Sequence, residues 1–334
     1  MKLSTKLFLF VLILCACGPV TPVNTDVLPS SIPQKYQDFS HQMIWAPDDS
    51  MIALTTNTGL YVYDTKTYEQ LAAFDDLGGA TAVFGNQYLA AVIHEKLFVW
   101  NVKDFSLLFT QNAHVGTYFL HVALSADEQT LATADQKQIQ YWHLPAGKLI
   151  AGMPAATFSS DMIFSGNDKL IIADTYIGTV QEWDVQTQKQ IRSVGFSKPV
   201  VNLNLSQDGK LVVVDYGDYG FETWDVDTGE LNHEYSDIIG APGWNNLSGD
   251  DKSVVVWGYG VGKESGLSVW DLSKHKKTFE LSTPLVNGDG WRCGVLNSNG
   301  SVLAASNNEG YVYFYDLESG QKIGEVFLTY KFTN

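Results

Sequence analysis

The sequence is poor in cysteine. Only three occur in 334 residues, and two of them, Cys15 and Cys17, lie close to the N-terminus. Cys293 therefore has no partner in the rest of the chain, and a framework of structural disulfides is excluded. The fold must be held together by packing. Hydrophobic residues at 45% and aromatic residues at 13% supply enough apolar material for a large core.

Positive charge is also scarce. The chain has a formal net charge of −16 and only two arginines, Arg192 and Arg292. Nucleic-acid binding needs clustered cations that replace the counterions of the phosphates. Docking of the protein body on anionic lipid needs a basic surface for the same reason. We therefore expect no nucleic-acid partner, and we expect the acidity to keep the protein soluble.

Long hydrophobic runs are missing as well. The most apolar segment, 7–14, has eight residues, whereas a membrane-spanning helix needs about 20 apolar residues. Lys2 and Lys6 precede this segment, and small Ala16 follows it. A basic start, a short apolar stretch and a small residue are typical of a secretory signal.

The segment Leu14-Cys15-Ala16-Cys17 resembles a bacterial lipoprotein signal. The resemblance implies cleavage after residue 16 and lipidation of Cys17; Cys15 fits less well because bulky Leu14 precedes it. The alternative is an ordinary secretory signal with two chance cysteines. More than one acyl chain is needed for stable anchoring, and the diacyl group of this family meets that requirement.

These features predict three parts of the chain: a signal peptide over 1–16, a lipidated Pro/Ser/Thr-rich tether over 17–38, and a folded body over 39–330. Prolines favour an extended tether. Gly18 follows the candidate lipidation site, where lipoproteins kept at a Gram-negative inner membrane carry Asp. The expected location is thus an outer membrane or cell surface, with the lipid on Cys17 as the membrane contact.

A repeat dominates the body. An aromatic residue followed by a polar residue recurs seven times at intervals of 37 to 46 residues. The pairs are Tyr63-Asp64, Trp100-Asn101, Trp142-His143, Trp183-Asp184, Trp224-Asp225, Trp270-Asp271 and Tyr315-Asp316. A constant period of this length indicates one supersecondary unit used seven times.

Each unit reads as four short strands separated by turn residues. The third unit predicts strands at 122–124, 130–133, 139–142 and 148–150. Short apolar runs separated by Asp, Gly, Ser and Asn are typical of all-β proteins. The last unit has its own candidate fourth strand at 322–328, so a closing blade shared by the two ends of the chain is not required.

The repeats resemble the WD repeats of a β-propeller. Three units keep the literal Trp-Asp pair, and the third unit approaches the family's buried polar set with His114, Thr133, Asp135 and Trp142. The resemblance implies an all-β, seven-bladed propeller with four-stranded antiparallel blades and with the repeated aromatics between blades. Quinoprotein-like and Tol-type propellers share this periodicity.

We expect the interaction surface on the face that carries the loops between second and third strands and the loops leading to the next blade. This loop face contains Tyr176 and the candidate residues Tyr216, Tyr219, Trp244, Tyr259, Trp291 and Arg292. Aromatic residues and Arg are enriched at interface centres. Three segments, 236–244, 258–266 and 282–292, are expected to be long loops of the last units.

Two functional classes follow. The first is a non-catalytic protein-interaction scaffold without metal or cofactor, held by lipid at a bacterial cell envelope. The alternative is a propeller enzyme, lactonase-like or quinoprotein-like, with a metal or cofactor in the central channel. The sequence contains no Gly-x-Ser-x-Gly or His-Glu-x-x-His motif. Such an enzyme needs polar residues at equivalent channel positions, and segments 122–124 and 202–205 predict a mostly apolar channel wall.

Overall fold

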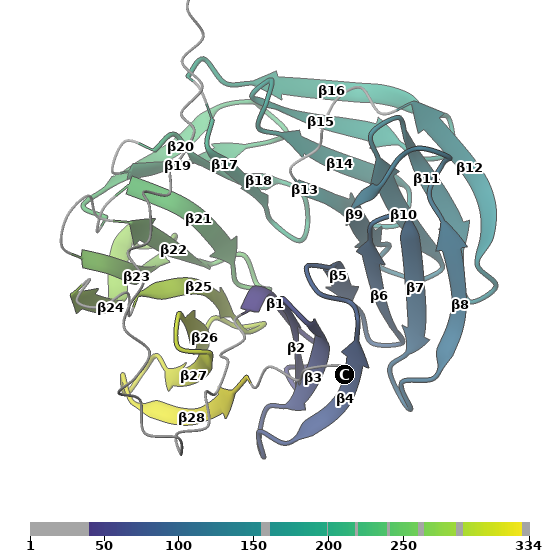
Figure 1. Ribbon diagram of the computed structural model, residues 1–334. Coiled ribbons are helices and arrows are strands. Elements are labelled where there is room, and N and C mark those ends of the chain that lie inside the picture. The colour runs from purple at the N-terminus through teal and green to yellow at the C-terminus, as the bar shows by residue number, and fades with distance from the viewer. Residues whose placement is uncertain are drawn as a thin grey trace, which may run out of the picture. The chain divides into compact units, whose positions relative to one another are not determined.

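The computed structural model describes residues 40–154, 161–198, 200–217, 220–238, 241–259, 264–284 and 290–328. Only the backbone is described at 241–244, 259, 264–265 and 283–284. The predicted signal peptide, Cys17 and the whole of the predicted tether lie outside these residues. Every regular element in the described part is a β-strand (Figure 1). None of the described residues belongs to a helix of the length and hydrophobicity that crossing a membrane requires.

The strands form seven sheets of four consecutive strands each, which we number as blades 1 to 7. Blades 1 to 4 comprise β1 (Ser40–Trp45), β2 (Met51–Thr56), β3 (Gly59–Asp64), β4 (Gln70–Asp75); β5 (Thr81–Phe84), β6 (Tyr88–Ile93), β7 (Lys96–Asn101), β8 (Leu107–Asn112); β9 (Phe119–Leu124), β10 (Thr130–Asp135), β11 (Gln138–His143), β12 (Lys148–Pro154); and β13 (Asp161–Ser165), β14 (Lys169–Asp174), β15 (Thr179–Asp184), β16 (Lys189–Gly195).

Blades 5 to 7 continue the same order. They comprise β17 (Asn202–Leu205), β18 (Leu211–Asp215), β19 (Gly220–Asp225), β20 (Leu231–Ser236); β21 (Ala241–Leu247), β22 (Ser253–Tyr259), β23 (Glu264–Asp271), β24 (Lys276–Pro284); and β25 (Trp291–Leu296), β26 (Val302–Asn307), β27 (Tyr311–Asp316), β28 (Lys322–Phe327). The predicted all-β propeller of seven four-stranded antiparallel blades is thus confirmed.

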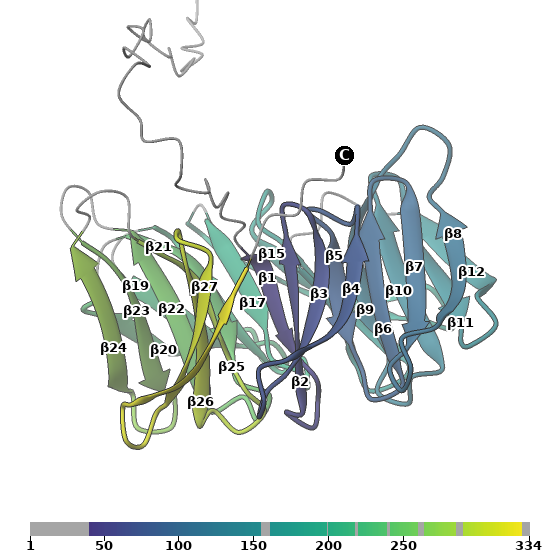
Figure 2. The same ribbon diagram turned by 60° about the horizontal axis from the view of Figure 1, so that its bottom comes forward.

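Position in the blade determines the burial of each strand. The first strands surround the centre of the ring and the fourth strands lie on its outside (Figures 1 and 2). The second strand β2 is buried along almost its whole length, whereas four of the six residues of the fourth strand β4 are exposed. A strand covered on both faces is continuously apolar, and an outer strand is not.

Seven buried hydrophobic clusters hold the blades together, and each cluster draws its residues from two adjacent blades. The repeated aromatics lie on the third strands and belong to these clusters, as predicted. Trp100, Trp142 and Trp270 are buried, while Trp183, Trp224 and Tyr315 are partly buried. The recurring aromatic therefore packs the interface between one blade and the next.

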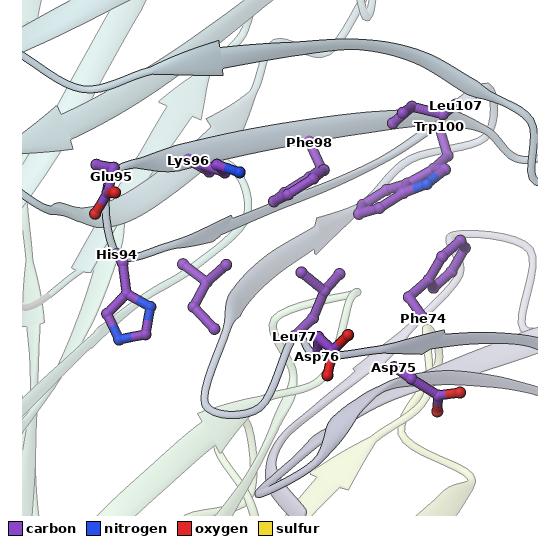
Figure 3. Close-up of a pocket in the computed structure, with 11 residues that line it drawn as sticks. Phe74, Asp75, Asp76, Leu77, His94, Glu95, Lys96, Phe98, Trp100 and Leu107 are labelled. Atoms are coloured by element: carbon purple, nitrogen blue, oxygen red, sulfur yellow. The ribbon is translucent and has the colours of Figure 1, made fainter. Parts of the chain in front are cut away.

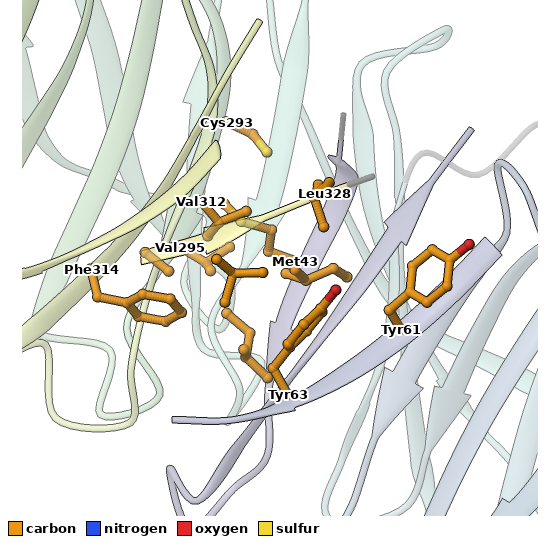
Figure 4. Close-up of a cluster of buried hydrophobic side chains, with 12 residues drawn as sticks. Met43, Tyr61, Tyr63, Cys293, Val295, Val312, Phe314 and Leu328 are labelled. Atoms are coloured by element: carbon orange, nitrogen blue, oxygen red, sulfur yellow. The ribbon is translucent and has the colours of Figure 1, made fainter. Parts of the chain in front are cut away.

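Blades 7 and 1 form the closing interface of the ring (Figure 4). Phe314 of β27 is 1% exposed and contacts Trp45 and Tyr68, with ring centroids 5.9 and 4.9 Å apart. Met43 and Tyr63 lie in the same cluster. Because each blade uses consecutive strands, the ring closes through side chains and not through a blade shared by both ends.

Turn residues add a second set of contacts between blades. In blades 1, 3 and 6, the first turn, between the first and second strands, carries an acidic residue with positive φ. These residues are Asp49, Glu128 and Asp251, with φ values of 60, 54 and 58°. Each carboxylate accepts a hydrogen bond from the first turn of the preceding blade. Asp49 accepts from the Ser298 N–H and hydroxyl at 2.8 and 2.6 Å, and Asp251 accepts from the Gln207 N–H at 3.0 Å. The left-handed conformation, unusual for these residues, thus accompanies a contact between blades.

Blades 3 and 4, 4 and 5, and 6 and 7 join the same region by other hydrogen bonds, such as that from the Asp127 N–H to Asn167 Oδ1 at 2.9 Å. Blades 1 and 2 are the exception, because their first turns, which are fully described, share no hydrogen bond. Pro47 stands where Gln207 and Ser298 donate, and proline has no N–H. The facing turn of blade 2, between Phe84 and Tyr88, is shorter than the turn between Trp45 and Met51 in blade 1. Instead, the Gln42 side-chain amide bonds both the N–H and the carbonyl of Ala82, at 3.0 and 3.3 Å.

A β-bulge lies opposite the aromatic residue in the outer strand pair of every blade. In five blades the extra residue is an exposed aliphatic: Leu71, Leu108, Ile150, Ile191 and Ile323. Bulges twist an outer strand and disrupt its pairing edge, which protects a sheet from edge-to-edge association. The sequence analysis did not predict them.

The three predicted long loops are largely wrong. Strands β21, β22, β23 and β24 extend into 236–244, 258–266 and 282–292, and β24 reaches nine residues. Of the short connections that remain, 237–238 and 290 are described, and 239–240, 260–263 and 285–289 lie outside the described residues. Glycine, proline and asparagine in these segments suggested turns, but strand pairing in blade 6 continues through them.

The polar set of the third unit forms only in part. The Trp142 indole donates to Thr133 Oγ1 at 2.9 Å, both side chains being buried. Asp135 accepts from the Thr117 hydroxyl at 2.9 Å and from the His114 backbone N–H at 3.4 Å. The His114 ring instead contacts the Val115 carbonyl.

Candidate interaction surfaces

The predicted contact residues occupy different environments. Trp291 is 7% exposed and packs between blades 6 and 7, with its ring 6.1 Å from that of Tyr313. It therefore supports the loop face from below and does not form its surface. Arg292 is exposed and donates from Nε to Asn308 Oδ1 at 2.5 Å.

Tyr216 is partly buried, and the Lys198 ammonium lies 4.6 Å from the centre of its ring. Lys198 also pairs with Glu222 at 3.0 Å. Cation–π and ionic contacts together hold this part of the loop face. Tyr219 lies outside the described residues. Trp244 and Tyr259 belong to β21 and β22, and only their backbone is described.

An exposed apolar patch lies nearby on the loops of blades 4 and 5. Tyr176 is 84% exposed, Ile177 44% and Val201 52%. The Asp174 carboxylate accepts the N–H groups of Tyr176 and Ile177 at 2.9 and 3.1 Å, which fixes the backbone of this loop. We call Tyr176, Ile177 and Val201 the loop patch. Tyr176 and Ile177 face solvent from the turn between β14 and β15, and Val201 faces solvent from the connection between β16 and β17, where its N–H donates to the Asp215 carbonyl at 2.7 Å. Contact residues of a rigid scaffold are placed in this way.

A groove between blades 1 and 2 is the second apolar surface (Figure 3). It has a volume of about 510 Å³ and is lined by Phe74 and Leu77 of blade 1 and by Ile93, Phe98, Trp100 and Leu107 of blade 2. Phe98 stacks on Trp100 with centroids 5.6 Å apart and planes 10° from parallel. Phe74 packs on the same indole at 4.4 Å.

Charged residues border the groove where it reaches the loop face. Asp75 ends β4 and Asp76 follows it, while His94 and Glu95 form the loop between β6 and β7, and Lys96 begins β7. The Tyr61 hydroxyl donates to Asp75 at 3.2 Å. Within the described part of the chain, Asp76, Glu95 and Lys96 form no ion pair with one another or with another residue. The border thus has three carboxylates against one lysine.

The groove was not predicted, although the sequence holds a signal for it. In blades 3 to 6 the residue two positions before the repeated aromatic is polar: Gln140, Gln181, Glu222 and Ser268. In blades 4, 5 and 6 this residue accepts from the tryptophan indole N–H at 3.2, 2.8 and 3.0 Å. In blades 1, 2 and 7 it is aromatic, namely Tyr61, Phe98 and Tyr313, and Phe98 is the one of the seven residues without a polar side-chain group. Phe98 therefore makes the outer part of the interface between blades 1 and 2 apolar.

The central channel has a volume of about 730 Å³ and is lined mainly by the first strands. Contrary to the prediction of a mostly apolar wall, polar side chains occupy equivalent positions in blades 1 to 5: Gln42, Thr81, His121, Asp161 and Asn202. Side chains along these strands alternate between channel and interface, and the alternation of single polar residues was missed.

Two of these polar groups bond neighbouring strands. Gln42 bonds Ala82, and Asp161 accepts the N–H of Leu205 in the next blade at 3.4 Å. Burial raises the pKa of the Asp161 carboxyl, and nearby His121 acts in the opposite direction. First strands need partners for their free backbone groups, and these side chains supply them. Among the described residues, no three His, Cys, Asp or Glu side chains are grouped as metal ligands would be.

Comparison with known proteins places the chain by fold. No family model matches it. A solved structure described as KlHsv2 with loop 6CD replaced by a Gly-Ser linker is similar over 87% of this chain and 99% of its own, with a TM-score of 0.62. The two sequences are 14% identical. At this identity the similarity supports the β-propeller fold alone.

Proposed function

We propose that this protein is a non-catalytic protein-interaction scaffold, exported and held by lipid at a bacterial cell envelope. The observation that carries the proposal is the loop patch, which presents Tyr176, Ile177 and Val201 to solvent from hydrogen-bonded loops. Exposed apolar residues grouped on one face mark contact sites, and tyrosine is among the residues that contribute most to binding. The propeller supplies a rigid support for the loops.

Attachment follows from the lipoprotein-like sequence. In this proposal residues 1–16 are removed, Cys17 carries the lipid, and 17–38 tether the propeller to an outer membrane or cell surface. The repeats are interpreted as degenerate WD repeats, which the Trp-Asp pairs and the Trp142–Thr133 hydrogen bond support. The partner is a protein, without nucleic acid, metal or cofactor.

The contact role is tested by capture from envelope extracts. We expect Tyr176→Ser/Ile177→Ser to lose a specific captured protein that the unchanged chain retains. The matched control is Leu149→Ser/Ile150→Ser, which removes two aliphatics of 48% and 52% exposure from an outer strand of blade 3. Equal capture by both double variants would contradict the role of the loop patch.

The anchor is tested separately. A Cys17→Ser precursor should remain unlipidated and fractionate away from membranes, because the protein body is acidic and has no other predicted membrane contact. Mass spectrometry of the mature N-terminus gives the modification directly. Quantitative membrane fractionation of the Cys17→Ser chain would show that the anchor is assigned wrongly.

A further inference from the structure

We propose that the groove between blades 1 and 2 binds a peptide segment in which large apolar residues stand beside lysine or arginine. The inference deepens the proposed function, because it names a contact surface and the chemistry of its partner. It depends on three observations: an aromatic interior, a carboxylate border and a side chain without a polar group at a repeat position where the other six blades carry one.

The first observation is the apolar interior. Phe74, Phe98 and Trp100 form a continuous aromatic wall, with centroid separations of 4.4 and 5.6 Å along it. Leu107 of the outer strand remains 53% exposed at its edge. A volume of about 510 Å³ lies within the range of roughly 300–1,000 Å³ that ligand sites occupy. The groove therefore has room for large apolar side chains and offers them aromatic contacts.

The second observation is the charge of the border. Asp75, Asp76 and Glu95 stand against Lys96 alone, on a chain whose net charge is −16. Asp76 and His94 adopt positive φ values of 69 and 49°, so the two loops that border the groove turn sharply at these residues. Carboxylates at the border attract a cationic segment and disfavour an acidic one. Charge complementarity thus selects basic residues beside the apolar ones.

The third observation is the contrast with other blades. Gln181, Glu222 and Ser268 bond their own tryptophan at this position, and blades 1 and 7 carry Tyr61 and Tyr313. Phe98 instead gives blade 2 a ring without a polar group. At the neighbouring interface, Gly147 of blade 3 has φ 62°, and a Cβ there would lie 2.5 Å from the Phe109 ring. Gln111 Nε2 also donates to the Gly147 carbonyl at 2.8 Å. The outer strand of blade 2 is thus in close contact with blade 3, whereas the groove separates the outer strand of blade 1 from blade 2.

The test uses fluorescence anisotropy with three labelled peptides, Gly-Ser-Lys-Lys-Trp-Leu-Gly-Ser and two altered forms. One altered form replaces Lys-Lys by Glu-Glu, and the other replaces Trp-Leu by Ser-Ser. We expect only the first peptide to bind appreciably, with an affinity that falls as salt rises, because the carboxylates lie at the surface. Equal binding of the Glu-Glu peptide, or of the Ser-Ser peptide, would overturn the proposal.

Variants then locate the site. Phe98→Gln introduces the residue that blades 3 and 4 carry at this position, so the fold is expected to tolerate it, and binding should weaken more than tenfold. Leu107→Ser should weaken binding about fivefold, since a half-buried leucine loses part of its contact. Leu149→Ser is the matched control, because Leu149 pairs with Trp142 as Leu107 pairs with Trp100. Unchanged binding in folded Phe98→Gln would overturn the proposal.

Charge is tested in the same way. Asp76→Gly removes one border carboxylate while suiting the positive φ, and it should lower affinity a few-fold and reduce the salt dependence. Asp237→Gly is the control, since Asp237 follows β20 as Asp76 follows β4 and has φ 73°. Equal effects of the two changes would contradict a role for the groove border.

The outcomes separate this inference from the proposed function. Capture from envelope extracts that is lost in Tyr176→Ser/Ile177→Ser but unaffected by Phe98→Gln, together with no peptide binding, would overturn the groove and leave the scaffold intact. If the chain self-associates and Leu107→Ser makes it monomeric, a second copy occupies the groove and the proposal is wrong. Peptide binding lost in Phe98→Gln but kept in Leu149→Ser supports it, whatever the location of the protein.

Discussion

Blade 1 takes part in two unlike interfaces. Toward blade 7 it packs Met43 and Tyr63 against buried Phe314, and Asp49 accepts hydrogen bonds from Ser298. Toward blade 2 its first turn carries Pro47 and makes no such bond, and the outer part of the interface opens into the groove. In a ring of similar blades, the side chains that pack each interface can therefore differ from one interface to the next. The closing interface joins the two ends of the folded ring, whereas blades 1 and 2 are already connected by the chain.

The largest expected effect separates the two interfaces by packing. Phe314→Ala should lower the free energy of unfolding by about 3–5 kcal/mol, because it leaves a cavity in a fully buried cluster. Phe98→Gln should cost about 1–2 kcal/mol, since part of that ring already faces the groove. Denaturant unfolding measures both. Equal losses would show that the closing interface contributes no more to the free energy of unfolding than the interface of blades 1 and 2.

The next effect concerns the turn hydrogen bonds. Asp49→Ala should destabilise by about 2–3 kcal/mol, because a charged acceptor of three hydrogen bonds from Asn297 and Ser298 is lost. Asp49→Gly should cost about 1 kcal/mol less, since glycine adopts φ 60° without strain. Thermal unfolding of the two variants tests the difference. A fully stable Asp49→Gly protein would mean that these bonds contribute nothing.

A smaller change tests why blades 1 and 2 differ. Pro47→Ala restores an N–H, but the short hairpin of blade 2 offers it no acceptor, so we expect a loss of about 0.4–1 kcal/mol from the added freedom of the unfolded chain. Ala126→Pro should cost more, because it removes the donor to the Gly166 carbonyl at 3.2 Å. Stabilisation by Pro47→Ala would show that the proline is the only cause of the missing bond.

The smallest effect is expected at the interface of blades 5 and 6, where His233 stacks on His275 with ring centroids 3.8 Å apart. Burial, and then the nearby His275, lower the pKa of His233. The unfolded chain then binds the proton more readily, so stability should fall as pH drops below about 6.5 and level off below the lowered pKa.

His275→Asn should weaken this pH dependence, whereas the same change at exposed His143 should leave it unaltered. Denaturant unfolding at several pH values between 5 and 8 measures both. Identical pH profiles for the unchanged chain and His275→Asn would exclude the histidine pair as the cause. The closing interface between blades 7 and 1 serves as the comparison, because its buried cluster contains no histidine among the described residues.

Much of the fold was predictable because its determinants are local. The aromatic-polar pairs predicted the third strands, and the Asp-, Ser- and Gly-rich segments predicted the turns. The β-bulges were not predictable, because Leu71 and Ile191 differ from ordinary strand residues only in their register with the neighbouring strand. The loops 236–244, 258–266 and 282–292 were wrong because pairing within blade 6 outweighed the turn preference of their residues.

The candidate surfaces were less predictable. Tyr176 is exposed and Trp291 is buried, although both are aromatics in segments assigned to the loop face. The difference arises because Trp291 packs on Tyr313 of its own blade and lies in a cluster with Val255 and Leu267 of blade 6, which no local pattern reveals. Phe98 carried a signal for the groove, since it breaks the polar pattern of blades 3 to 6, but its consequence depends on Phe74 from another blade.

The order of residues alone determined the number of blades, their strands and the place of the repeated aromatics, because hydrophobic period and turn chemistry act over a few residues. Tertiary structure decided which interfaces are filled, which carboxylates join adjacent turns and where an apolar surface stays open. Those features depend on side chains from two blades meeting across an interface, and packing at each meeting depends on shapes that the repeat itself does not specify.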